Sequence, residues 1–424
     1  MNKSSEIEMK NICVFGLGYI GLPTAAMFAH HGANVIGVDI NQHAVDTINQ
    51  GKIHIVEPGL EAIVKQAVDN GKLKASLTPV HSDAYLIAVP TPFKGDDHEP
   101  DLSYIQAVSK ALAPLLGKGD LVILESTSPV GATEKMVEWL AEERSDLSFP
   151  KYHEPNVEAD IFVAYCPERV LPGKVVEELI SNDRIIGGMT KESTKKAQEI
   201  YRIFVEGELL ETNSRTAEMA KLTENASRDV SIAFANELSI ISDKLDINVW
   251  ELIELANHHP RVNILQPGAG VGGHCIAVDP WFIVNQNPDE AKIIRAAREI
   301  NDSKPDWVIG KINAEVSELQ AQGVSKPTVA LLGLAFKPNI DDLRESPAVN
   351  IARKMLDMDQ AEILLVEPNI KQLPEKLTAG NLVSLDIAIE QADVLVVLVA
   401  HDEFKKEQLS SNARVVDVVS GLCR

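Results

Sequence analysis

The chain has 424 residues, enough for about three domains of ordinary size, and 45% of its residues are hydrophobic while 24% are charged. This composition is typical of a folded globular protein and argues against a disordered chain, a collagen-like repeat or a disulfide-rich scaffold. With 62 acidic and 40 basic residues the net charge is −22, so nucleic acid and anionic membrane surfaces are not expected as partners.

The cysteines and the amino terminus indicate the compartment. Four cysteines, at positions 13, 166, 275 and 423, show neither paired spacing nor the density of a secreted scaffold, which favours a reducing environment. Residues 1–11 lack the apolar segment of a signal peptide, and the longest apolar runs, such as 394–400, are too short to span a bilayer. We therefore expect a cytoplasmic protein.

The amino-terminal half begins with alternating strand and helix patterns. A strand, a glycine turn, a helix and a second strand follow one another over 11–40, and further apolar strands are predicted in 84–92, 120–127 and 161–169. This alternation is typical of a doubly wound parallel sheet, so we expect an α/β, Rossmann-like domain over 1–205.

The pattern then becomes helical. Continuous helical periodicity runs from about Thr212 to Ala256, and after a glycine-rich loop at 267–273 a second helical stretch runs from about 289 to 322. This second stretch is long enough to connect two domains. We expect a helical middle domain over 206–322 that carries both the loop and the connecting helix.

Strand patterns return at the carboxyl end. Apolar runs at 328–336, 362–369, 393–400 and 414–419 are separated by helical segments. They predict a second, smaller, Rossmann-like parallel-sheet domain over 323–424. The expected architecture is therefore two such domains joined by a helical middle domain and a long connecting helix.

A glycine motif in the first domain predicts a dinucleotide site. Gly16, Gly18 and Gly21 form a GxGxxG sequence between a strand and a helix, where bare backbone can approach a pyrophosphate. Asp39 ends the next strand, where its carboxylate can accept both ribose hydroxyls and repel the extra phosphate of NADP. The pattern predicts NAD as cofactor; the alternative is an unoccupied glycine turn.

A second glycine cluster, 267–273, has no apolar strand before it and is not a second dinucleotide motif. Its glycines would let a loop pass close to a ligand and let backbone N–H groups face an oxyanion beside Cys275. Cys275 is thus a candidate nucleophile. Cys13 and Cys166 lie in apolar strand runs, so we expect them to be buried.

Lys221, Asn225 and Arg228 lie at i, i+4 and i+7 of a predicted helix and share one face. A solvated charged face is the usual explanation of such a stripe. Interleaved apolar residues and the net charge of −22 weaken that explanation, because an anionic substrate would need local cations to be held. Such a cluster can act inside a cleft, since long-range repulsion is screened beyond about 8 Å at physiological salt.

His258 and His259 raise the question of a metal site. Adjacent histidines lack the i, i+4 spacing of a chelating pair on a helix, and no cysteine or carboxylate completes a ligand set. No metal is predicted.

Seven segments across essentially the whole chain resemble, in order, the motifs of the UDP-sugar 6-dehydrogenases. They are GLGYIGLP (16–23), VPTPF (89–93), ESTSPVG (125–131), CPERVLPG (166–173), AEMAKLTEN (217–225), GVGGHCIAVDP (270–280) and GLAFKPNIDDLRESP (333–347). Within that family, 212–225 and 259–284 are most similar to the UDP-N-acetyl-D-mannosamine dehydrogenases that supply the uronic acid of enterobacterial common antigen. The resemblance implies oxidation of the sugar C6 alcohol to a carboxylate by two NAD+, through an aldehyde held on cysteine.

The resemblance also implies catalytic roles. Cys275 corresponds to the nucleophile, while Lys221 and Asn225 correspond to the groups that stabilise negative charge on the C6 oxygen. Glu168 matches a carboxylate that activates water, and Asp279 matches an acid that organises proton transfer beside the nucleophile.

Binding contacts follow from the same resemblance. The substrate contacts, besides Lys221 and Asn225, are Arg169, Val170, Arg228, His259, Arg261, Gly272, Phe336 and Lys337. The cofactor contacts, besides the glycines and Asp39, are Tyr19, Ile20, Thr91, Thr133 and Arg344. Thr127, which like Thr91 ends a predicted strand, is also expected near the cofactor, although both threonines would equally suit helix caps. We expect a homodimer formed through the helical middle domain.

Two departures and three alternatives remain open at this point. Pro172 and Ser420 stand where UDP-glucose dehydrogenases usually carry a glutamate and often a basic residue, which disfavours UDP-glucose and leaves contacts to the uridine phosphates less certain. The alternatives are another UDP-sugar substrate, such as UDP-N-acetylglucosamine or UDP-glucose, a β-hydroxyacid dehydrogenase-type two-electron enzyme, and a non-catalytic NAD-binding regulator. The second has no need of Cys275 in a glycine loop, and the third would be free to lose Lys221, Glu168 and Cys275.

Overall fold

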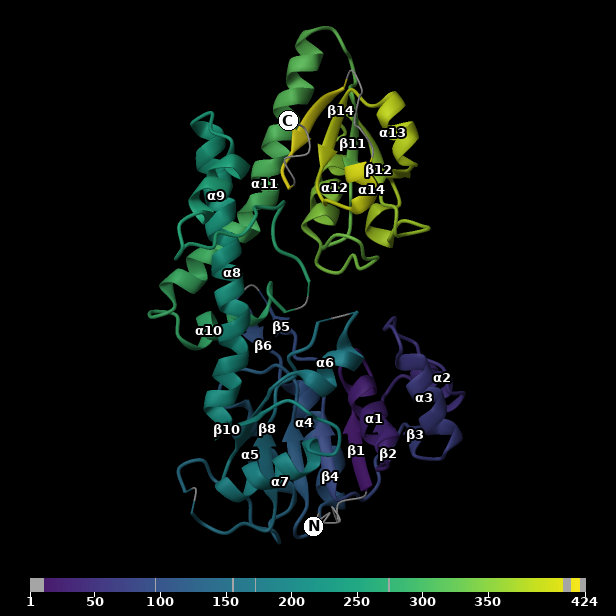
Figure 1. Ribbon diagram of the computed structural model, residues 1–424, viewed down its shortest axis with the longest axis vertical. Coiled ribbons are helices and arrows are strands. Elements are labelled where there is room, and N and C mark those ends of the chain that lie inside the picture. The colour runs from purple at the N-terminus through teal and green to yellow at the C-terminus, as the bar shows by residue number, and fades with distance from the viewer. Residues whose placement is uncertain are drawn as a thin grey trace. The chain divides into compact units, whose positions relative to one another are not determined.

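A computed structural model describes residues 11–95, 97–154, 156–171, 173–273, 275–406 and 413–419. The chain forms two compact units, Met1–Thr223 and Glu224–Arg424, and the division falls within helix α8 (Ser214–Lys244) (Figure 1). Each unit contains a sheet with helices, which confirms the expected α/β class with two Rossmann-like sheets. The division into three domains stays a prediction. Pro172, Ser420 and Cys423 lie outside the described residues.

The first unit carries the elements that precede α8. In chain order they are β1 (Asn11–Phe15), α1 (Gly21–His30), β2 (Asn34–Val38), α2 (Gln42–Asn49), α3 (Leu60–Asp69), β3 (Leu73–Ser76), β4 (Ala84–Ile87), β5 (Phe93–Lys94), β6 (Glu99–Pro100), α4 (Ser103–Leu112), η1 (Ala113–Leu115), β7 (Leu121–Leu124), α5 (Ala132–Glu143), β8 (Phe162–Tyr165), α6 (Val175–Ser181), β9 (Arg184–Gly188), α7 (Lys191–Tyr201) and β10 (Leu209–Asn213). β5 and β6 form a small antiparallel hairpin of their own.

The main sheet of this unit has eight strands among the described residues, in the order β10-β9-β8-β7-β4-β1-β2-β3. Six neighbouring strands of this sheet, β8, β7, β4, β1, β2 and β3, are mutually parallel, as expected. In contrast, β9 is antiparallel to β8. Strands β3, β9 and β10 were not predicted. Their sequences explain this, because each mixes apolar residues with polar residues or glycines and lacks a continuous apolar run.

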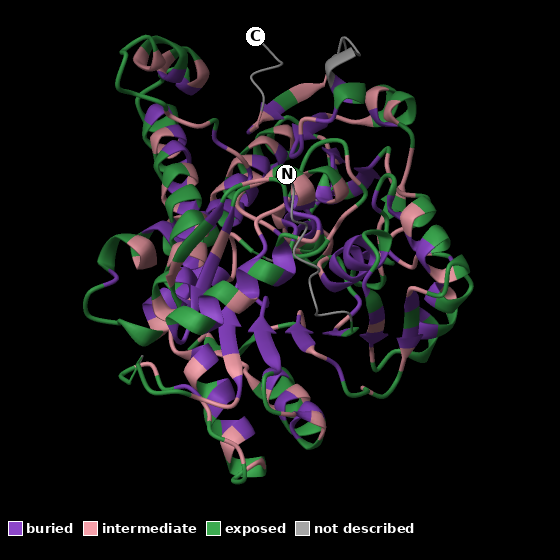
Figure 2. Ribbon diagram, turned by 60° about the horizontal axis from the view of Figure 1, so that its bottom comes forward, coloured by how far each residue is buried: buried purple, intermediate pink, exposed green. Residues whose placement is uncertain are grey.

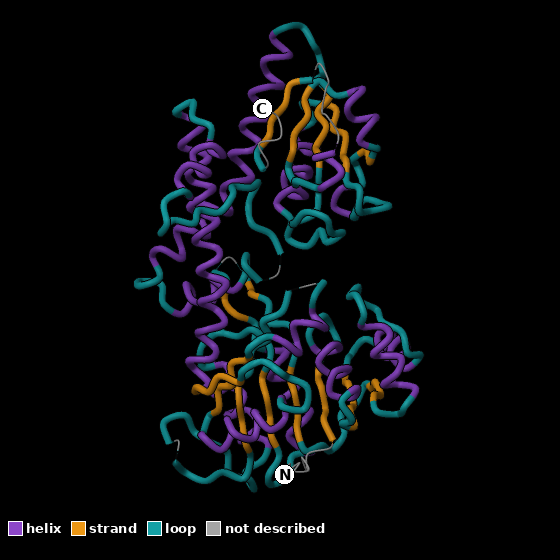
Figure 3. Tube along the Cα trace, viewed as in Figure 1, coloured by secondary structure: helices purple, strands orange, loops and turns teal. Residues whose placement is uncertain are grey.

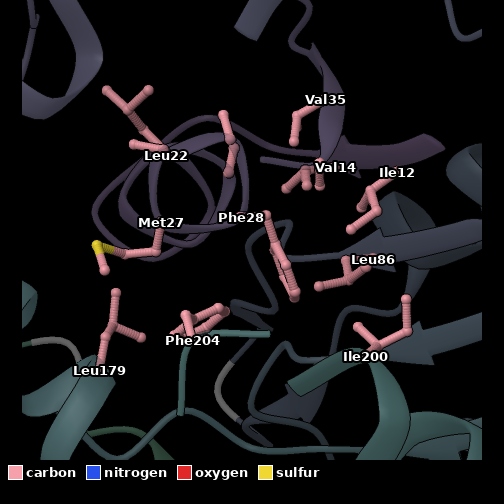
Figure 4. Close-up of a cluster of buried hydrophobic side chains, with 14 of the residues drawn as sticks. Ile12, Val14, Leu22, Met27, Phe28, Val35, Leu86, Leu179, Ile200 and Phe204 are labelled. Atoms are coloured by element: carbon pink, nitrogen blue, oxygen red, sulfur yellow. The ribbon is translucent and has the colours of Figure 1, made fainter. Parts of the chain in front are cut away.

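The core of the first unit lies on both faces of the sheet. Alternate residues of β1 enter different apolar clusters: Ile12 and Val14 pack on the face covered by α1, and Cys13 and Phe15 pack on the face covered by α4 and α5. Phe28 of α1 lies beside the strand residue Leu86, and its ring meets that of Phe204 edge-on (Figure 4). The central strands are accordingly coloured almost entirely as buried in Figure 2. Burial on both faces is why these strands read as unbroken apolar runs.

The second unit contains the rest of α8 and the elements after it. They are α9 (Val249–Asn257), α10 (Asp279–Gln286), α11 (Lys292–Ala321), β11 (Thr328–Leu332), α12 (Pro347–Met358), β12 (Glu362–Val366), η2 (Glu375–Leu377), β13 (Asn381–Leu382), α13 (Leu385–Gln391), β14 (Val394–Val397), α14 (Asp402–Lys406) and β15 (Arg414–Asp417). The strands form a parallel sheet in the order β13-β12-β11-β14-β15, drawn in orange in Figure 3. The second half of α11 packs with α12 on this sheet through Val308, Ile312 and Ile351.

Candidate active site

The glycine turn between β1 and α1 is shaped by backbone contacts at two of its three glycines. Gly16 has φ of 84°, and a Cβ added there would lie 2.6 Å from the carbonyl oxygen of Ala88. A Cβ at Gly21 would lie 1.8 Å from the carbonyl oxygen of Gly16, whereas one at Gly18 would meet nothing within 4 Å. Gly16 and Gly21 therefore allow the tight turn and the close packing of α1. Gly18 leaves an open approach to the backbone, as a dinucleotide pyrophosphate requires.

Asp39 follows β2 and is half-buried beside this turn. Its Oδ2 accepts the amide of Leu17 at 2.8 Å, and its Oδ1 accepts the amide of Asn41 at 2.8 Å. The carboxylate is thus held next to the turn while part of it stays accessible. Gly18 and Tyr19 are exposed at the same place, so these residues fit a bound NAD.

The predicted threonines take part in hydrogen bonds within the protein. Thr91 donates its hydroxyl to the carbonyl of Thr127. Thr133 is fully buried at the start of α5, where its amide and hydroxyl donate to Glu218 at 2.8 and 2.6 Å and Gly131 donates at 2.7 Å. Thr133 therefore uses its hydroxyl to anchor α5 on α8. Its role as a cofactor contact stays a prediction, and Glu218, whose pKa burial raises to about 7, was not singled out from the sequence.

Glu168 lies in a buried charge cluster. Its Oε2 accepts a hydrogen bond from Arg184, its Oε1 accepts the amide of Arg169 at 2.7 Å, and the side chain is nearly buried. The same guanidinium donates to Glu125 at 3.1 Å, and Tyr201 donates its hydroxyl to Glu125 at 2.5 Å. Burial raises the pKa of Glu125 above its ordinary value. Arg184 and Glu125 are 59 residues apart, so no local sequence pattern indicates this pair.

The loop after Glu168 is fixed at its far end by a residue from another part of the unit. Glu57 accepts the amides of Gly173 and Val175 at 2.9 and 2.8 Å and so caps the start of α6. Val170 packs against the apolar core beneath α1, and Arg169 is half-buried. Glu57 was also missed from the sequence, because a cap supplied from 116 residues away leaves no local pattern.

Helix α8 carries the predicted cationic face. Lys221 and Asn225 are half-buried and lie one turn apart, and Arg228 is exposed. Asn225 Nδ2 donates to Asp279 Oδ2 at 2.5 Å, and Asp279, buried at the start of α10, donates its amide to the carbonyl of Cys275 at 2.8 Å. Asn225 of α8 is therefore in contact with Asp279, which in turn is hydrogen-bonded to the backbone of Cys275.

The three described cysteines differ sharply in environment. Cys13 and Cys166 are buried, and burial raises the pKa of Cys13 to about 12 and that of Cys166 further above the ordinary range. Cys275 is exposed in the turn that precedes α10. A thiol that acts as a nucleophile must reach its substrate and ionise, which the two buried thiols do not.

The glycines before Cys275 contribute to packing within the protein. A Cβ at Gly272 would lie 2.5 Å from the carbonyl oxygen of Glu345 and 2.9 Å from Cβ of Phe336, so this glycine allows close packing on the segment 336–347. The amide of Gly268 donates to Asn236 at 2.9 Å, and that of Gly273 donates to the carbonyl of Arg344 at 3.4 Å. These two amides therefore have acceptors within the protein, and the role of the loop beside an oxyanion stays a prediction.

The remaining predicted substrate and cofactor contacts are spread over the second unit. Phe336 is half-buried against the glycine loop, and Lys337 is exposed beside it. His259 and Arg261 are exposed in the loop after α9, and the guanidinium of Arg344 pairs with Asp342 at 2.6 Å. Their roles as substrate and cofactor contacts stay predictions.

Two kinds of feature are absent from the described residues. No group of three or more His, Cys, Asp or Glu side chains in this part of the chain is arranged to hold a metal ion. None of the described helices has the length and apolar character needed to cross a membrane.

Sequence comparison places the chain in a family. Profiles for the UDP-glucose/GDP-mannose dehydrogenase family match over residues 10–205 as its NAD binding domain, 215–303 as its central domain and 330–422 as its UDP binding domain. The chain belongs to this family. It is an NAD-dependent UDP-sugar dehydrogenase, which confirms the enzyme class and the cofactor expected from Gly16, Gly18, Gly21 and Asp39.

Individual relatives cover nearly the whole chain. UDP-N-acetyl-D-mannosamine dehydrogenase of Escherichia coli (strain K12) is 64% identical over 403 residues, 94% of this chain and 95% of that protein. NDP-N-acetyl-D-galactosaminuronic acid dehydrogenase of Ralstonia solanacearum is 57% identical over 406 residues, 96% of this chain and 94% of that protein. The solved structure of UDP-D-ManNAc dehydrogenase from Pyrococcus horikoshii superposes with a TM-score of 0.86 at 38% identity and covers 98% of this chain and 96% of that one.

Proposed function

We propose that the enzyme oxidises UDP-N-acetyl-D-mannosamine at C6 to UDP-N-acetyl-D-mannosaminuronate in two successive two-electron steps. The substrate assignment is supported by the 64% identity to a relative of that name. The mechanism is supported by one feature above all: an exposed cysteine whose own segment carries Asp279, which Asn225 holds from α8.

In the first step the C6 alcohol loses a hydride and a proton and becomes an aldehyde. Bound NAD+ supplies the hydride acceptor for both oxidations. The ammonium of Lys221 and the amide of Asn225 stabilise negative charge on the C6 oxygen as it develops. Asp279 fixes the orientation of the Asn225 amide through their hydrogen bond.

In the second step the Cys275 thiolate adds to the aldehyde carbon and forms a C–S bond. Loss of a second hydride converts the resulting thiohemiacetal into a thioester. Water then adds to the thioester carbon, the C–S bond breaks, and the carboxylate leaves with the thiolate restored. Per sugar, two NAD+ are reduced, one water is consumed and three protons are released.

Glu168 is the group that we assign to the water. Its carboxylate accepts hydrogen bonds from Arg184 and from the amide of Arg169, and we assign it as the base that takes a proton from the water. Because each of its oxygens already accepts one of these bonds, it has a fixed orientation. A base of fixed orientation suits a hydrolysis in which the water must attack from one side.

Counting cofactor turnover tests the cysteine. The unmodified enzyme should produce two NADH per sugar oxidised, and Cys275→Ser should bind NAD+ and UDP-sugar normally but form no thioester. Lys221→Ala should slow turnover by roughly 10², as loss of an oxyanion donor typically does. Mass spectrometry of quenched enzyme should place the sugar on Cys275. One NADH per sugar from the unmodified enzyme, or normal turnover by Cys275→Ser, would refute this mechanism and favour a two-electron dehydrogenase.

A substrate panel tests the sugar. Initial rates with UDP-N-acetyl-D-mannosamine should exceed those with UDP-N-acetylglucosamine, UDP-N-acetylgalactosamine and UDP-glucose by at least tenfold in kcat/KM, about 1.4 kcal/mol. The N-acetylgalactosamine sugar belongs in the panel because a relative named for its uronic acid is 57% identical. A higher kcat/KM for any other sugar would overturn the substrate assignment.

We also propose that the enzyme is a homodimer formed through the helical middle region. Phe234 and Ile241 lie seven residues apart on α8, Leu245 directly follows the last residue of that helix, and the three side chains are 50%, 47% and 60% exposed. Such an apolar stripe on one helix is typical of a surface that another helix covers. Leu245→Asp should convert the dimer into a monomer in sedimentation experiments. An unmodified protein that sediments as a monomer would contradict the proposal.

The pathway and the compartment are proposed on the resemblance of 212–225 and 259–284 and on the scarce cysteines. We place the enzyme in the cytoplasm, supplying the uronic acid of a surface polysaccharide of the enterobacterial common antigen type. Deleting the gene from its host should remove N-acetylmannosaminuronate from the surface polysaccharide. Cell fractionation should recover the enzyme with cytoplasmic markers.

A further inference from the structure

Two long helices of the second unit face each other through polar side chains. Asp229 and Asn236 of α8 and Arg298 and Asn301 of α11 are all at most 1% exposed. Arg298 Nη1 and Asn301 Nδ2 donate to Asp229 Oδ1 at 2.7 and 2.8 Å, and Asn236 Nδ2 donates to Asn301 Oδ1 at 2.9 Å. We call these four residues the α8–α11 polar ladder. A buried polar network often stabilises a fold less than well-packed apolar side chains of similar volume would. Its presence between two helices therefore calls for an explanation other than stability.

The ladder also holds the chain on both sides of Cys275. Asn236 Oδ1 accepts the amide of Gly268, seven residues before the cysteine, at 2.9 Å. Arg298 Nη1 reaches the carbonyl of Ile276, the residue after the cysteine, at 3.4 Å. The described residues between these two points, 269–273 and 275, form a glycine-rich loop and turn, which has many conformations to lose when it is ordered.

We propose that the α8–α11 polar ladder positions the nucleophile, with Asn236 and Arg298 as the two residues that hold the Cys275 segment. The proposal rests on the role assigned to Cys275 above. None of the four residues is placed in contact with substrate or cofactor, so they are positioning residues. They act by limiting where the thiol lies when the aldehyde forms. A displaced thiol leaves the first oxidation intact and slows the capture of the aldehyde.

The next rung of the same helix pair provides a matched control. Lys304 of α11, fully buried, donates to Ser239 of α8, which is 6% exposed. No described contact of this rung involves residues 267–276. Ser239→Ala removes this bond and the one that Ser239 Oγ donates to the backbone carbonyl of Asn236, while the bond from the Gly268 amide to the Asn236 side chain remains.

The experiment compares Asn236→Ala with Ser239→Ala in the full-length enzyme. Asn236→Ala should lower kcat roughly tenfold or more, change the rate at which iodoacetamide alkylates Cys275, and reduce the yield from two NADH per sugar toward one as aldehyde escapes. The KM for NAD+ should not change. Ser239→Ala should keep the normal NADH yield and alkylation rate, even if its thermal stability falls as much as that of Asn236→Ala. Asn236→Asp, which still accepts the Gly268 amide, should recover part of the yield.

A second variant covers the case in which Asn236→Ala does not fold. Arg298→Lys keeps a positive charge beside Asp229 and withdraws the donor from the Ile276 carbonyl, so it should show the same loss of NADH yield in a milder form. Normal yield and alkylation in a folded Asn236→Ala or Arg298→Lys enzyme would overturn the proposal. Normal turnover by Cys275→Ser would instead overturn the assigned nucleophile, so the two failures are distinguishable.

Discussion

The two sheets of this enzyme begin with the same turn. Gly16 after β1 and Gly333 after β11 have φ of 84° and 92°, and each donates its amide to the last residue of the next strand at 2.8 Å. An acid then follows that strand: Asp39 accepts the amide of Leu17, and Glu367 accepts that of Leu334, at 2.8 and 2.7 Å. At the level of backbone and hydrogen bonds the second turn is a copy of the dinucleotide turn.

The side chains make the two turns different. The place of Gly18 is taken in the second turn by Ala335, which is 1% exposed. Glu367 is 3% exposed, and His401 and Asn369 hydrogen-bond to it at 3.0 and 3.1 Å. The second acid is thus used inside the protein, while Asp39 stays accessible. A strand followed by a glycine turn and an acid is thus a structural feature of both sheets. Of the two turns, the one with an open backbone and an accessible acid fits NAD.

The largest effect should come from removing the acid of the second turn, and it should be a loss of stability. Glu367→Ala removes the acceptor of two backbone amides and of His401, all buried, and should lower the free energy of unfolding by about 3 to 5 kcal/mol, the usual result of breaking a buried pair. Urea unfolding measures this loss. The KM for NAD+ of the folded fraction should stay the same. A large increase in that KM would mean that the second turn takes part in cofactor binding.

The corresponding change in the first turn should act on the cofactor instead. Asp39→Ala should weaken NAD+ binding by roughly 10- to 100-fold, since hydrogen bonds to a charged group contribute about 1.5 to 3 kcal/mol. The preference for NAD+ over NADP+ should fall with it, because the repulsion of the 2′-phosphate is lost. Initial rates with both cofactors give the ratio. Equal use of both cofactors by the unmodified enzyme would show that Asp39 does not face the ribose.

Gly18→Ala transfers the alanine of the second turn into the first. The added Cβ meets no protein atom within 4 Å, so the variant should fold as well as the unmodified enzyme or be more stable by about 0.4 to 1 kcal/mol. Its KM for NAD+ should nevertheless rise by roughly tenfold, because the methyl group stands where the pyrophosphate approaches. Unchanged cofactor kinetics would place the pyrophosphate elsewhere. The reverse change, Ala335→Gly, should leave NAD+ binding as it is.

The smallest effect should be opposite responses of the two units to pH. Burial raises the pKa of Glu218 to about 7 from an ordinary 4.5, so its contribution to stability is complete below 4.5 and is lost as the pH rises through 7. Burial acts to raise the pKa of Glu367 as well, but hydrogen bonds from His401 and from two backbone amides lower it to about 2. Its contribution is present above 4.5 and is lost as the pH falls toward 2.

Hydrogen exchange measured by mass spectrometry reports the two units separately. After correction for intrinsic exchange rates, peptides at the start of α5 should be less protected at pH 8 than at pH 5. Peptides of β12 should be less protected at pH 3 than at pH 6. A response of both regions in the same direction would contradict the assigned pKa shifts.

Many elements of this fold could be predicted from short stretches of consecutive residues. The buried strands β1, β4 and β7 are apolar runs, and the GxGxxG motif is recognisable from six consecutive residues between a strand and a helix. What the sequence did not predict are interactions between distant residues, such as Glu125 with Arg184 and Glu57 with the start of α6. The predicted nucleophile segment is intermediate: its glycines are visible, but their packing on 336–347 depends on a sheet that forms later in the chain.

The helix that joins the two units sets a limit on how this family can be engineered. The units meet between Thr223 and Glu224, inside the continuous helix α8, and this point separates Lys221 from Asn225. A gene fusion or chimera cut at the boundary would divide the two residues assigned to charge stabilisation between different parents. In a chimera made to exchange substrate specificity among relatives, the whole of Ser214–Lys244 should therefore come from one parent. The residues that pack against this helix should come from the same parent.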